Sequence, residues 1–271
     1  MKGRVLIIAG SDPSGGAGLQ ADIKTVSALG GYAMTAVTAI TVQNTQGVTD
    51  IQPISPAFIR AQIDAVAGDI GIDAIKVGMI AERDAAIEIA KFLKEVDAAG
   101  IPIVLDPVLG ATSGDALAGD GVAGVIYNEM LACSTLATPN ADELAVLSDE
   151  AVPKTTDELL RLGEKLVRRS GRALLLKGGH IGGDEVVDIL LDGGEMTLFR
   201  NERIDTTSTH GTGCTLASAI ATKLAQGASL VEATKHATSY VHQAIKCAPG
   251  FGNGHGPLNH AWSIVLKEGS S

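Results

Sequence analysis

The chain has 271 residues, 45% of them hydrophobic and only 3% aromatic, so it can bury a substantial core but is poorly suited to stacking on nucleic-acid bases. Its formal net charge of −10 at pH 7, without a basic stripe, also argues against binding to nucleic acid or to a membrane surface. No apolar run reaches the length of a membrane span, and the apolar residues 5–9 are too few for a secretion signal. The three cysteines, Cys133, Cys214 and Cys247, lack the spacing of disulfide pairs or zinc ligands. We therefore expect a cytoplasmic protein.

Short aliphatic segments typical of buried strands alternate with segments of helical periodicity. Strands are predicted at residues 5–9, 33–42, 74–77, 103–105, 136–138 and 173–176. Helices are predicted at residues 19–29, 84–96, 141–147, 156–169, 212–225 and 230–246, and another begins at Ser55-Pro56. Two further strands, residues 186–191 and 195–200, flank a glycine turn and form a hairpin. The polar residues 267–271 are expected to form a frayed tail.

This alternation predicts a single α/β domain over residues 1–271, with helices on both faces of a mostly parallel sheet and the hairpin as an antiparallel addition at one edge. In such folds, ligands bind beyond the carboxyl ends of the strands. Polar or glycine-rich segments follow the predicted strands at residues 10–18, 43–44, 76–79, 106–107, 139–140 and 177–179. We therefore expect an active site at this edge of the sheet.

The first glycine-rich loop follows the first predicted strand. Residues 16–21 formally fit the dinucleotide-binding pattern G-x-G-x-x-A. However, the loop is long, and the next strand runs into Gln43-Asn44 where an acidic residue would bind a ribose, which makes a nicotinamide-dependent oxidoreductase the weaker interpretation. A glycine-rich turn without a ligand is another alternative. The P-loop pattern G-x-x-x-x-G-K-[ST] does not occur in the sequence.

The second glycine-rich loop, residues 205–214, leads directly into a predicted helix. Gly211 and Gly213 allow backbone N–H groups to point inward, and the start of the helix adds partial positive charge, which together favour a bound phosphate. Cys214 lies near the helix start, where the pKa of a thiol can fall below its ordinary value of about 8.5. The alternative for Cys214 is a small buried side chain that packs the helix.

Together these segments resemble the hydroxymethylpyrimidine/phosphomethylpyrimidine kinases of the ribokinase-like superfamily. The resembling segments span nearly the whole chain in family order: residues 8–18, 20–25, 38–45, 76–79, 106–108, 138–140, 177–180, 209–214 and 256–262. The resemblance implies a ribokinase-like three-layer sandwich with a sheet of eight or nine strands. It also implies two ATP-dependent phosphorylations in thiamin biosynthesis, which convert 4-amino-5-hydroxymethyl-2-methylpyrimidine to its monophosphate and then its diphosphate. A homodimer is plausible for this family.

The resemblance further implies roles for particular residues of this chain. The pyrimidine pocket would be lined by Gly10, Asp12, Ala17, Gln43 and Met79. ATP would be bound by Asn140, Lys177, Thr209 and Gly211. Mg²⁺ would be held by Asp106 and by Glu143, which is preferred to Asp142 because it completes an N-x-x-E pattern after Asn140. Phosphate transfer would depend on Lys177, on the anion-hole residues Gly211 and Gly213, and on Cys214 as the base.

Several of these residues also have plainer interpretations. Gln43 can both donate and accept, which suits a ring nitrogen beside an exocyclic amine, but it could simply bond to a loop. Met79 could be a core residue, and Lys177 could be a solvated loop cation. No chemistry is assigned to the six histidines: His180, His210, His236, His242, His255 and His260.

Two alternative functions remain open. Pyridoxal kinases share the superfamily and also phosphorylate a hydroxymethyl group on a nitrogen heterocycle, and one chain could accept both substrates. A non-catalytic nucleotide- or vitamin-binding protein could have the same fold. The presence together of Asp106, Glu143, Lys177 and Cys214 argues against the second alternative, because a binding protein does not need the full set.

Overall fold

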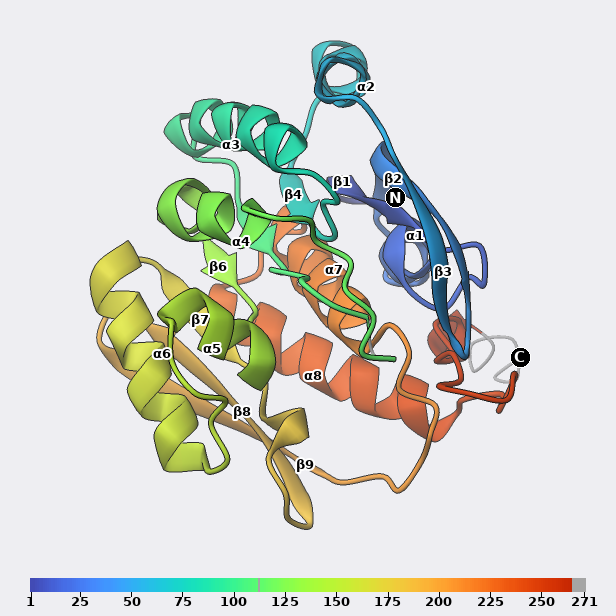
Figure 1. The fold of residues 1–271 in the computed structure, drawn as a ribbon, viewed down its shortest axis with the longest axis vertical. Helices are drawn as coiled ribbons and strands as arrows, with labels where there is room; N and C mark the ends of the chain where they lie inside the picture. Colours follow the sequence, from blue (N-terminus) through green and yellow to red (C-terminus); the bar gives the residue numbers. More distant parts are fainter. Residues whose placement is uncertain (112, 265–271) are drawn as a thin grey trace.

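The structure, a computed structural model, describes residues 1–111 and 113–264, so the predicted tail at residues 267–271 lies outside the described part. One sheet in the described part has the strand order β3-β2-β1-β4-β5-β6-β7-β8-β9 (Figure 1). Its strands are β1 (Arg4–Ser11), β2 (Tyr32–Asn44), β3 (Gly47–Pro53), β4 (Ala74–Val77), β5 (Ile103–Leu105), β6 (Leu136–Ala137), β7 (Ala173–Leu176), β8 (Glu185–Asp192) and β9 (Glu195–Glu202). The helices are α1 (Gly18–Ala28), α2 (Pro56–Asp69), α3 (Arg83–Ala98), α4 (Val122–Val125), α5 (Ala141–Ser148), α6 (Thr156–Ser170), α7 (Thr212–Ala225) and α8 (Leu230–Lys246).

The sheet is mostly parallel, as the sequence predicts. Strands β2, β1, β4, β5, β6 and β7 pair in parallel, and β8 and β9 add an antiparallel hairpin at one edge. The opposite edge carries a strand that the sequence analysis missed, β3, which pairs antiparallel with β2. Its residues Thr49, Asp50 and Gln52 are polar and exposed, so its sequence has little apolar alternation.

Helices cover both faces of this sheet, which gives the predicted three layers (Figure 1). The central residues of β1, positions 5–9, are all apolar because both faces of the strand are buried there. Leu6 and Ile8 pack on the face covered by α2 to α6, whereas Val5 and Ile7 pack on the face covered by α1, α7 and α8. A strand buried on both faces needs an apolar residue at every position. The predicted fold class is confirmed.

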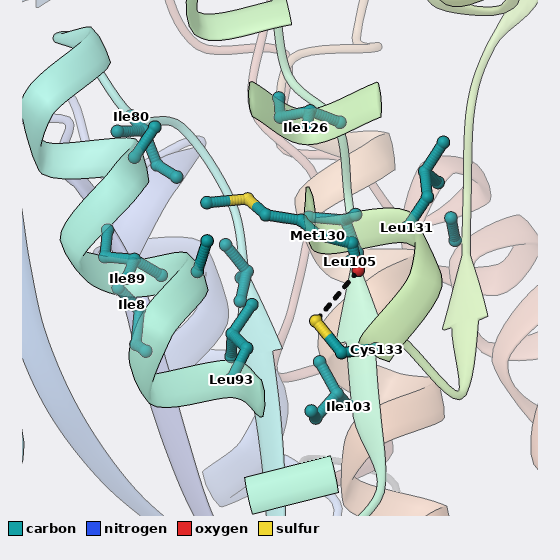
Figure 2. Packing of buried hydrophobic residues seen from close by; sticks show 14 of the residues in the cluster. Ile8, Ile80, Ile89, Leu93, Ile103, Leu105, Ile126, Met130, Leu131 and Cys133 are labelled. Carbon is teal, nitrogen blue, oxygen red and sulfur yellow. Dashed lines mark hydrogen bonds between the residues drawn. The ribbon is translucent and has the colours of Figure 1, made fainter. Parts of the chain in front are cut away.

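Cys133 belongs to the core rather than to a reactive site. Its thiol donates a hydrogen bond to the carbonyl of Met130 at 3.2 Å and lies in the cluster that contains Leu93, Ile103 and Leu105 (Figure 2). In the part of the chain that the structure describes, no helix is both long and apolar enough to cross a membrane.

The connectivity brings two glycine-rich loops to the same edge of the sheet. The first joins β1 to α1, and the second leads into α7, which packs against α1. Both loops therefore lie at the carboxyl ends of the parallel strands, with the N-termini of α1 and α7 directed toward the same region.

Candidate active site

A cavity of about 800 Å³ opens at the carboxyl ends of the strands. Its volume falls in the range of small-molecule sites. All of the residues that the sequence assigned to a site line it: Gly10, Asp12, Ala17, Gln43, Met79, Asp106, Asn140, Glu143, Lys177, Thr209, Gly211, Gly213 and Cys214. The structure thus brings residues from both ends of the chain into one place.

The Asp12 carboxylate holds the first glycine-rich loop in shape. It accepts hydrogen bonds from the backbone N–H of Ser14 at 2.9 Å and of Ala17 at 2.8 Å, and from the Ser14 hydroxyl at 2.9 Å. His210 Nε2 lies 2.8 Å from the same carboxylate. Burial raises the pKa of Asp12, but the hydrogen bonds from His210, Ser14 and Ala17 outweigh it, so the pKa lies below its ordinary value.

His210, to which the sequence analysis assigned no chemistry, connects the two glycine-rich loops. Its side chain is buried against Asp12, 198 positions away in the sequence. A Cβ atom on Gly16 would lie 2.3 Å from His210 Cδ2, and a Cβ on Gly211, whose φ is +82°, would lie 2.0 Å from the Gly16 carbonyl oxygen. The loops therefore pack backbone against backbone, and only glycine fits at the contact.

Gln43 and Met79 line the cavity beside the first glycine-rich loop. The Thr41 hydroxyl donates a hydrogen bond to Gln43 Oε1 at 3.1 Å. This contact does not use the amide nitrogen of Gln43, which can still donate to a ligand. Met79 is buried, and the Thr38 hydroxyl donates to its carbonyl at 2.7 Å. A Cβ on Gly10 would lie 2.5 Å from the Met79 sulfur, so the absence of a side chain at Gly10 makes room for Met79 beside the cavity.

Lys177 bridges the two carboxylates that were assigned to Mg²⁺. Its Nζ lies 3.0 Å from Asp106 Oδ1 and 3.4 Å from Glu143 Oε2. The Thr138 hydroxyl also donates to Asp106 Oδ1, at 3.0 Å. The ammonium group is therefore held among buried carboxylates, which excludes the solvated loop cation considered above. Burial lowers the pKa of Lys177, but Asp106 and Glu143 raise it above its ordinary value.

Glu143 and Asn140 form a capping box at the start of α5. The Asn140 side chain accepts from the Glu143 N–H at 2.8 Å, and Glu143 Oε2 accepts from the Asn140 N–H at 2.8 Å. The N-x-x-E pattern is thus a helix-start signal as well as a candidate ligand pattern. Burial raises the pKa of Glu143 against the opposing effect of Lys177, and Asp106 raises it further.

The two carboxylates fit a magnesium ion. Asp106 Oδ2 and Glu143 Oε1 take part in none of the contacts described above, so each carboxylate has an oxygen left to offer. A Cβ on Gly213 would lie 3.4 Å from Asp106 Oδ2, which places the first turn of α7 over this oxygen. Within the described residues, no group of three His, Cys, Asp or Glu side chains forms a metal site. Two carboxylates are sufficient for Mg²⁺, which retains several water ligands.

Two residues that the sequence analysis missed hold the loop after Lys177. Asp188 on β8 is buried and accepts from the Gly178 N–H at 2.9 Å, and burial raises the pKa of Asp188 to about 6. The Arg203 guanidinium donates to the carbonyls of Gly179, Ile181 and Gly183 at 2.9, 2.5 and 2.7 Å. Neither contact has a local sequence signal, because Asp188 lies on β8 and Arg203 follows β9, whereas the loop that they hold follows β7.

Cys214 lies in the first turn of α7, as predicted, but burial acts against the lowered thiol pKa that the sequence analysis considered for this position. Burial raises the pKa of Cys214 to about 12, although Lys76 and the backbone N–H of Gly18 act in the opposite direction, and Asp22 and Asp106 raise it further. The thiol lies among buried groups beside the cavity, where the loss of solvation disfavours a thiolate more than the helix start favours it.

Comparisons with known proteins agree over most of the chain. A family model described as phosphomethylpyrimidine kinase matches residues 12–259. A hydroxymethylpyrimidine/phosphomethylpyrimidine kinase from Rhizobium meliloti is 43% identical over 94% of this chain and 96% of its own length. The solved structure of a Bacillus subtilis pyridoxal kinase in complex with ADP has a TM-score of 0.88 at 33% identity, and covers 98% of this chain and 100% of that one. That of a phosphomethylpyrimidine kinase from Clostridium difficile has a TM-score of 0.78 at 36% identity, with 90% and 100% covered.

Proposed function

Because the chain belongs to the phosphomethylpyrimidine kinase family, we propose that it uses ATP to phosphorylate 4-amino-5-hydroxymethyl-2-methylpyrimidine and then the resulting monophosphate. We propose that it does so in the cytoplasm, as an enzyme of thiamin biosynthesis. The observation that carries this proposal is the meeting of Asp106, Glu143, Lys177 and Cys214 with the N-terminal turn of α7 around one cavity. A protein that only bound a nucleotide or a vitamin would not need this set. We also propose that residues 1–271 form one domain, since a single sheet passes through the described chain.

We place the pyrimidine beside Gly10, Ala17, Gln43 and Met79. The Gln43 amide can donate to a ring nitrogen and accept from an exocyclic amine, and Met79 supplies an apolar surface for the ring. Asp12 lines the same part of the cavity, but its carboxylate already accepts hydrogen bonds from its own loop and His210. Its contribution to substrate binding is therefore to shape the loop.

We place the ATP phosphates between Lys177 and the first turn of α7. Lys177 is a fixed cation there, and Gly211 and Gly213 allow the backbone of this turn to approach an anion closely. Asn140 and Thr209 line the same region and would complete the nucleotide site. Asp106 and Glu143 would hold Mg²⁺, which, when bound, would offset negative charge on the phosphates.

Cys214 would accept the hydroxyl proton in the first phosphorylation. Its raised pKa means that this role depends on the positive charges around it, chiefly Lys76, to favour the thiolate. Phosphoryl transfer depends mainly on positioning and charge stabilisation, so the base need contribute only about 10²- to 10⁴-fold.

A second candidate activity is the phosphorylation of pyridoxal, which is favoured by the TM-score of 0.88 to the Bacillus subtilis pyridoxal kinase. Both activities are tested by incubating the protein with Mg-ATP and either alcohol and following the products by mass spectrometry. Successive mono- and diphosphate from the pyrimidine support the proposed function. Pyridoxal phosphate alone would move the chain to the second activity, and no product from either alcohol would contradict both.

We further propose that the protein forms a homodimer through the outer end of β2. Ile40 and Val42 on this strand are 51% and 58% exposed, which is unusual for β-branched apolar residues on neighbouring positions of one strand face. They lie next to the edge strand β3, whose outer backbone groups form no ladder within the sheet.

A further inference from the structure

Lys76 is a fully buried lysine beneath the cavity. It lies on β4, and its Nζ donates to Asp22 Oδ2 on α1 at 2.7 Å, with both side chains completely inaccessible to solvent. The Ser218 hydroxyl on α7 donates to the other Asp22 oxygen at 2.7 Å. A strand and two helices thus meet at one buried ion pair.

This ion pair lies close to the reacting groups. Asp22 follows Gly18 by one turn on α1, and Ser218 follows Cys214 by one turn on α7, so the pair lies one helical turn below both N-terminal turns. After Asp22, the groups that most raise the pKa of Lys76 are Cys214 and Asp106, and burial opposes all three. A Cβ on Gly78 would lie 2.6 Å from Lys76 Nζ, so the chain after β4 also leaves space for the ammonium group.

Stability alone is a weak explanation for such a pair. Removing two charges from water is costly, and apolar residues of similar volume often stabilise a protein as well or better. The neighbours Ile75 and Val77 on the same short strand are apolar and equally buried. A charge retained at this position therefore points to a use for the charge itself.

We propose that Lys76 is a positioning residue for phosphoryl transfer, whose fixed positive charge stabilises negative charge at Cys214 and on the phosphoryl group in transfer. This inference rests on the proposed kinase function. Asp22, itself held by Ser218, keeps the ammonium group in place, and the exclusion of solvent from this ion pair lets the charge of Lys76 act on the first turn of α7 with little screening.

The first test compares Lys76→Met with the double variant Asp22→Asn/Lys76→Met. The single variant leaves Asp22 unpaired and is expected to be less stable, whereas the double variant removes both charges and restores the stability. We expect kcat to fall about 10- to 100-fold in the double variant, with the KM for Mg-ATP changed less than about 2-fold. If the double variant has both wild-type stability and wild-type kcat, the charge of Lys76 does not contribute to phosphoryl transfer and the proposal is wrong.

The second test does not require turnover. Alkylation of Cys214 by iodoacetamide, followed peptide by peptide, reports the thiolate fraction, and the exposed Cys247 serves as an internal reference. Because Asp22 raises the pKa of Cys214, the reference for this test is the single variant Asp22→Asn, which differs from the double variant only in the charge of Lys76. We expect Cys214 to react about 10-fold more slowly in the double variant than in Asp22→Asn, while Cys247 is unchanged. An unchanged or faster reaction, in a double variant as stable as Asp22→Asn, would overturn the proposal. If the wild type phosphorylates neither alcohol, the proposed function fails while this measurement still decides the charge effect of Lys76 on Cys214.

Discussion

The charged side chains of the cavity are held by the protein itself. Asp12 is held by its loop and His210, and Lys177 is held by Asp106 and Glu143. Interactions of this kind fix each group before a ligand arrives, so little reorganisation is needed at the moment of transfer. The same arrangement surrounds Cys214 with charged groups that shift its pKa in both directions: Lys76 lowers it, whereas Asp22 and Asp106 raise it.

The two phosphorylations should depend differently on Cys214. An alcohol must lose a proton when it attacks phosphorus, whereas the monophosphate already presents anionic oxygens. We expect Cys214→Ala to slow the first step about 100-fold and the second less than about 10-fold in single-turnover experiments. The exposed Cys247→Ala variant is the control and should leave both rates unchanged. Equal losses in the two steps would exclude Cys214 as the base.

Asp188 should make stability depend on pH in an unusual direction. Burial raises its pKa to about 6, so the folded state binds this proton more tightly than the unfolded state does. Relative to Asp188→Asn, the wild type should therefore gain stability as the pH falls from about 6 to 4. Asn keeps an oxygen for the Gly178 N–H, so the variant should be more stable by up to about 3 kcal/mol near pH 8, with no difference below about pH 4.

Urea denaturation of the nucleotide-free protein at several pH values measures this difference, because every other ionisable group is common to both proteins. A constant difference between the two proteins across the range would show that Asp188 has an ordinary pKa.

The candidate site was predictable from the sequence where a residue follows a strand, and not where a residue acts through a distant partner. Asp106 and Lys177 could be found because strand ends meet at one edge of a parallel sheet. His210, Asp188 and Arg203 could not, since each is defined by a contact that exists only after folding. The sequence left the two interpretations of Cys214 open for the same reason: the desolvation that raises its pKa comes from several elements at once.

At the scale of elements, the site depends on the close contact between the two glycine-rich loops. Gly211→Ala combines a left-handed backbone, at φ +82°, with a Cβ 2.0 Å from the Gly16 carbonyl. We expect the loops to separate and kinase activity to fall at least about 100-fold, because donors at the phosphate are displaced. Activity assays and urea denaturation of the variant measure both effects.

Gly227, between α7 and α8, provides the matched control. Its φ is +89°, but a Cβ there would meet no atom of the described residues within 4 Å. Gly227→Ala should therefore lose only the roughly 1–2 kcal/mol of left-handed strain and retain its activity. If the two alanine variants have similar activity, the contact between the loops is unimportant for transfer.

The secondary structure was predictable where apolar periodicity is strong. The buried strands β1, β4, β5 and β7 and the long helices all occur close to their predicted positions. Strand β3 and the short helix α4 were missed, because β3 is held by pairing with β2 along a polar edge and α4 has only four residues. Their formation depends on tertiary neighbours rather than on a local pattern.

At the scale of the whole molecule, the outer end of β2 contributes residues both to the cavity and to the exposed surface proposed as the dimer interface. Thr41 and Gln43 line the cavity, whereas the alternating residues Ile40 and Val42 point to the other side and are exposed. Alternation along one strand thus separates the candidate substrate site from the proposed dimer interface by the thickness of the sheet. Substitutions on the exposed side should leave the cavity lining in place.

We therefore expect Ile40→Glu/Val42→Glu to convert a dimer to a monomer in sedimentation velocity, because two carboxylates cannot be buried unpaired in an apolar interface. Met196→Glu is the control, since Met196 is 52% exposed on β9 at the opposite edge of the sheet and should leave the dimer intact. A monomeric wild type would refute the homodimer, and a dimeric double variant would place the interface elsewhere. If the monomer retains kinase activity, each chain carries a complete site; if activity is lost while the fold is kept, the partner chain supports the β2 end that carries Thr41 and Gln43.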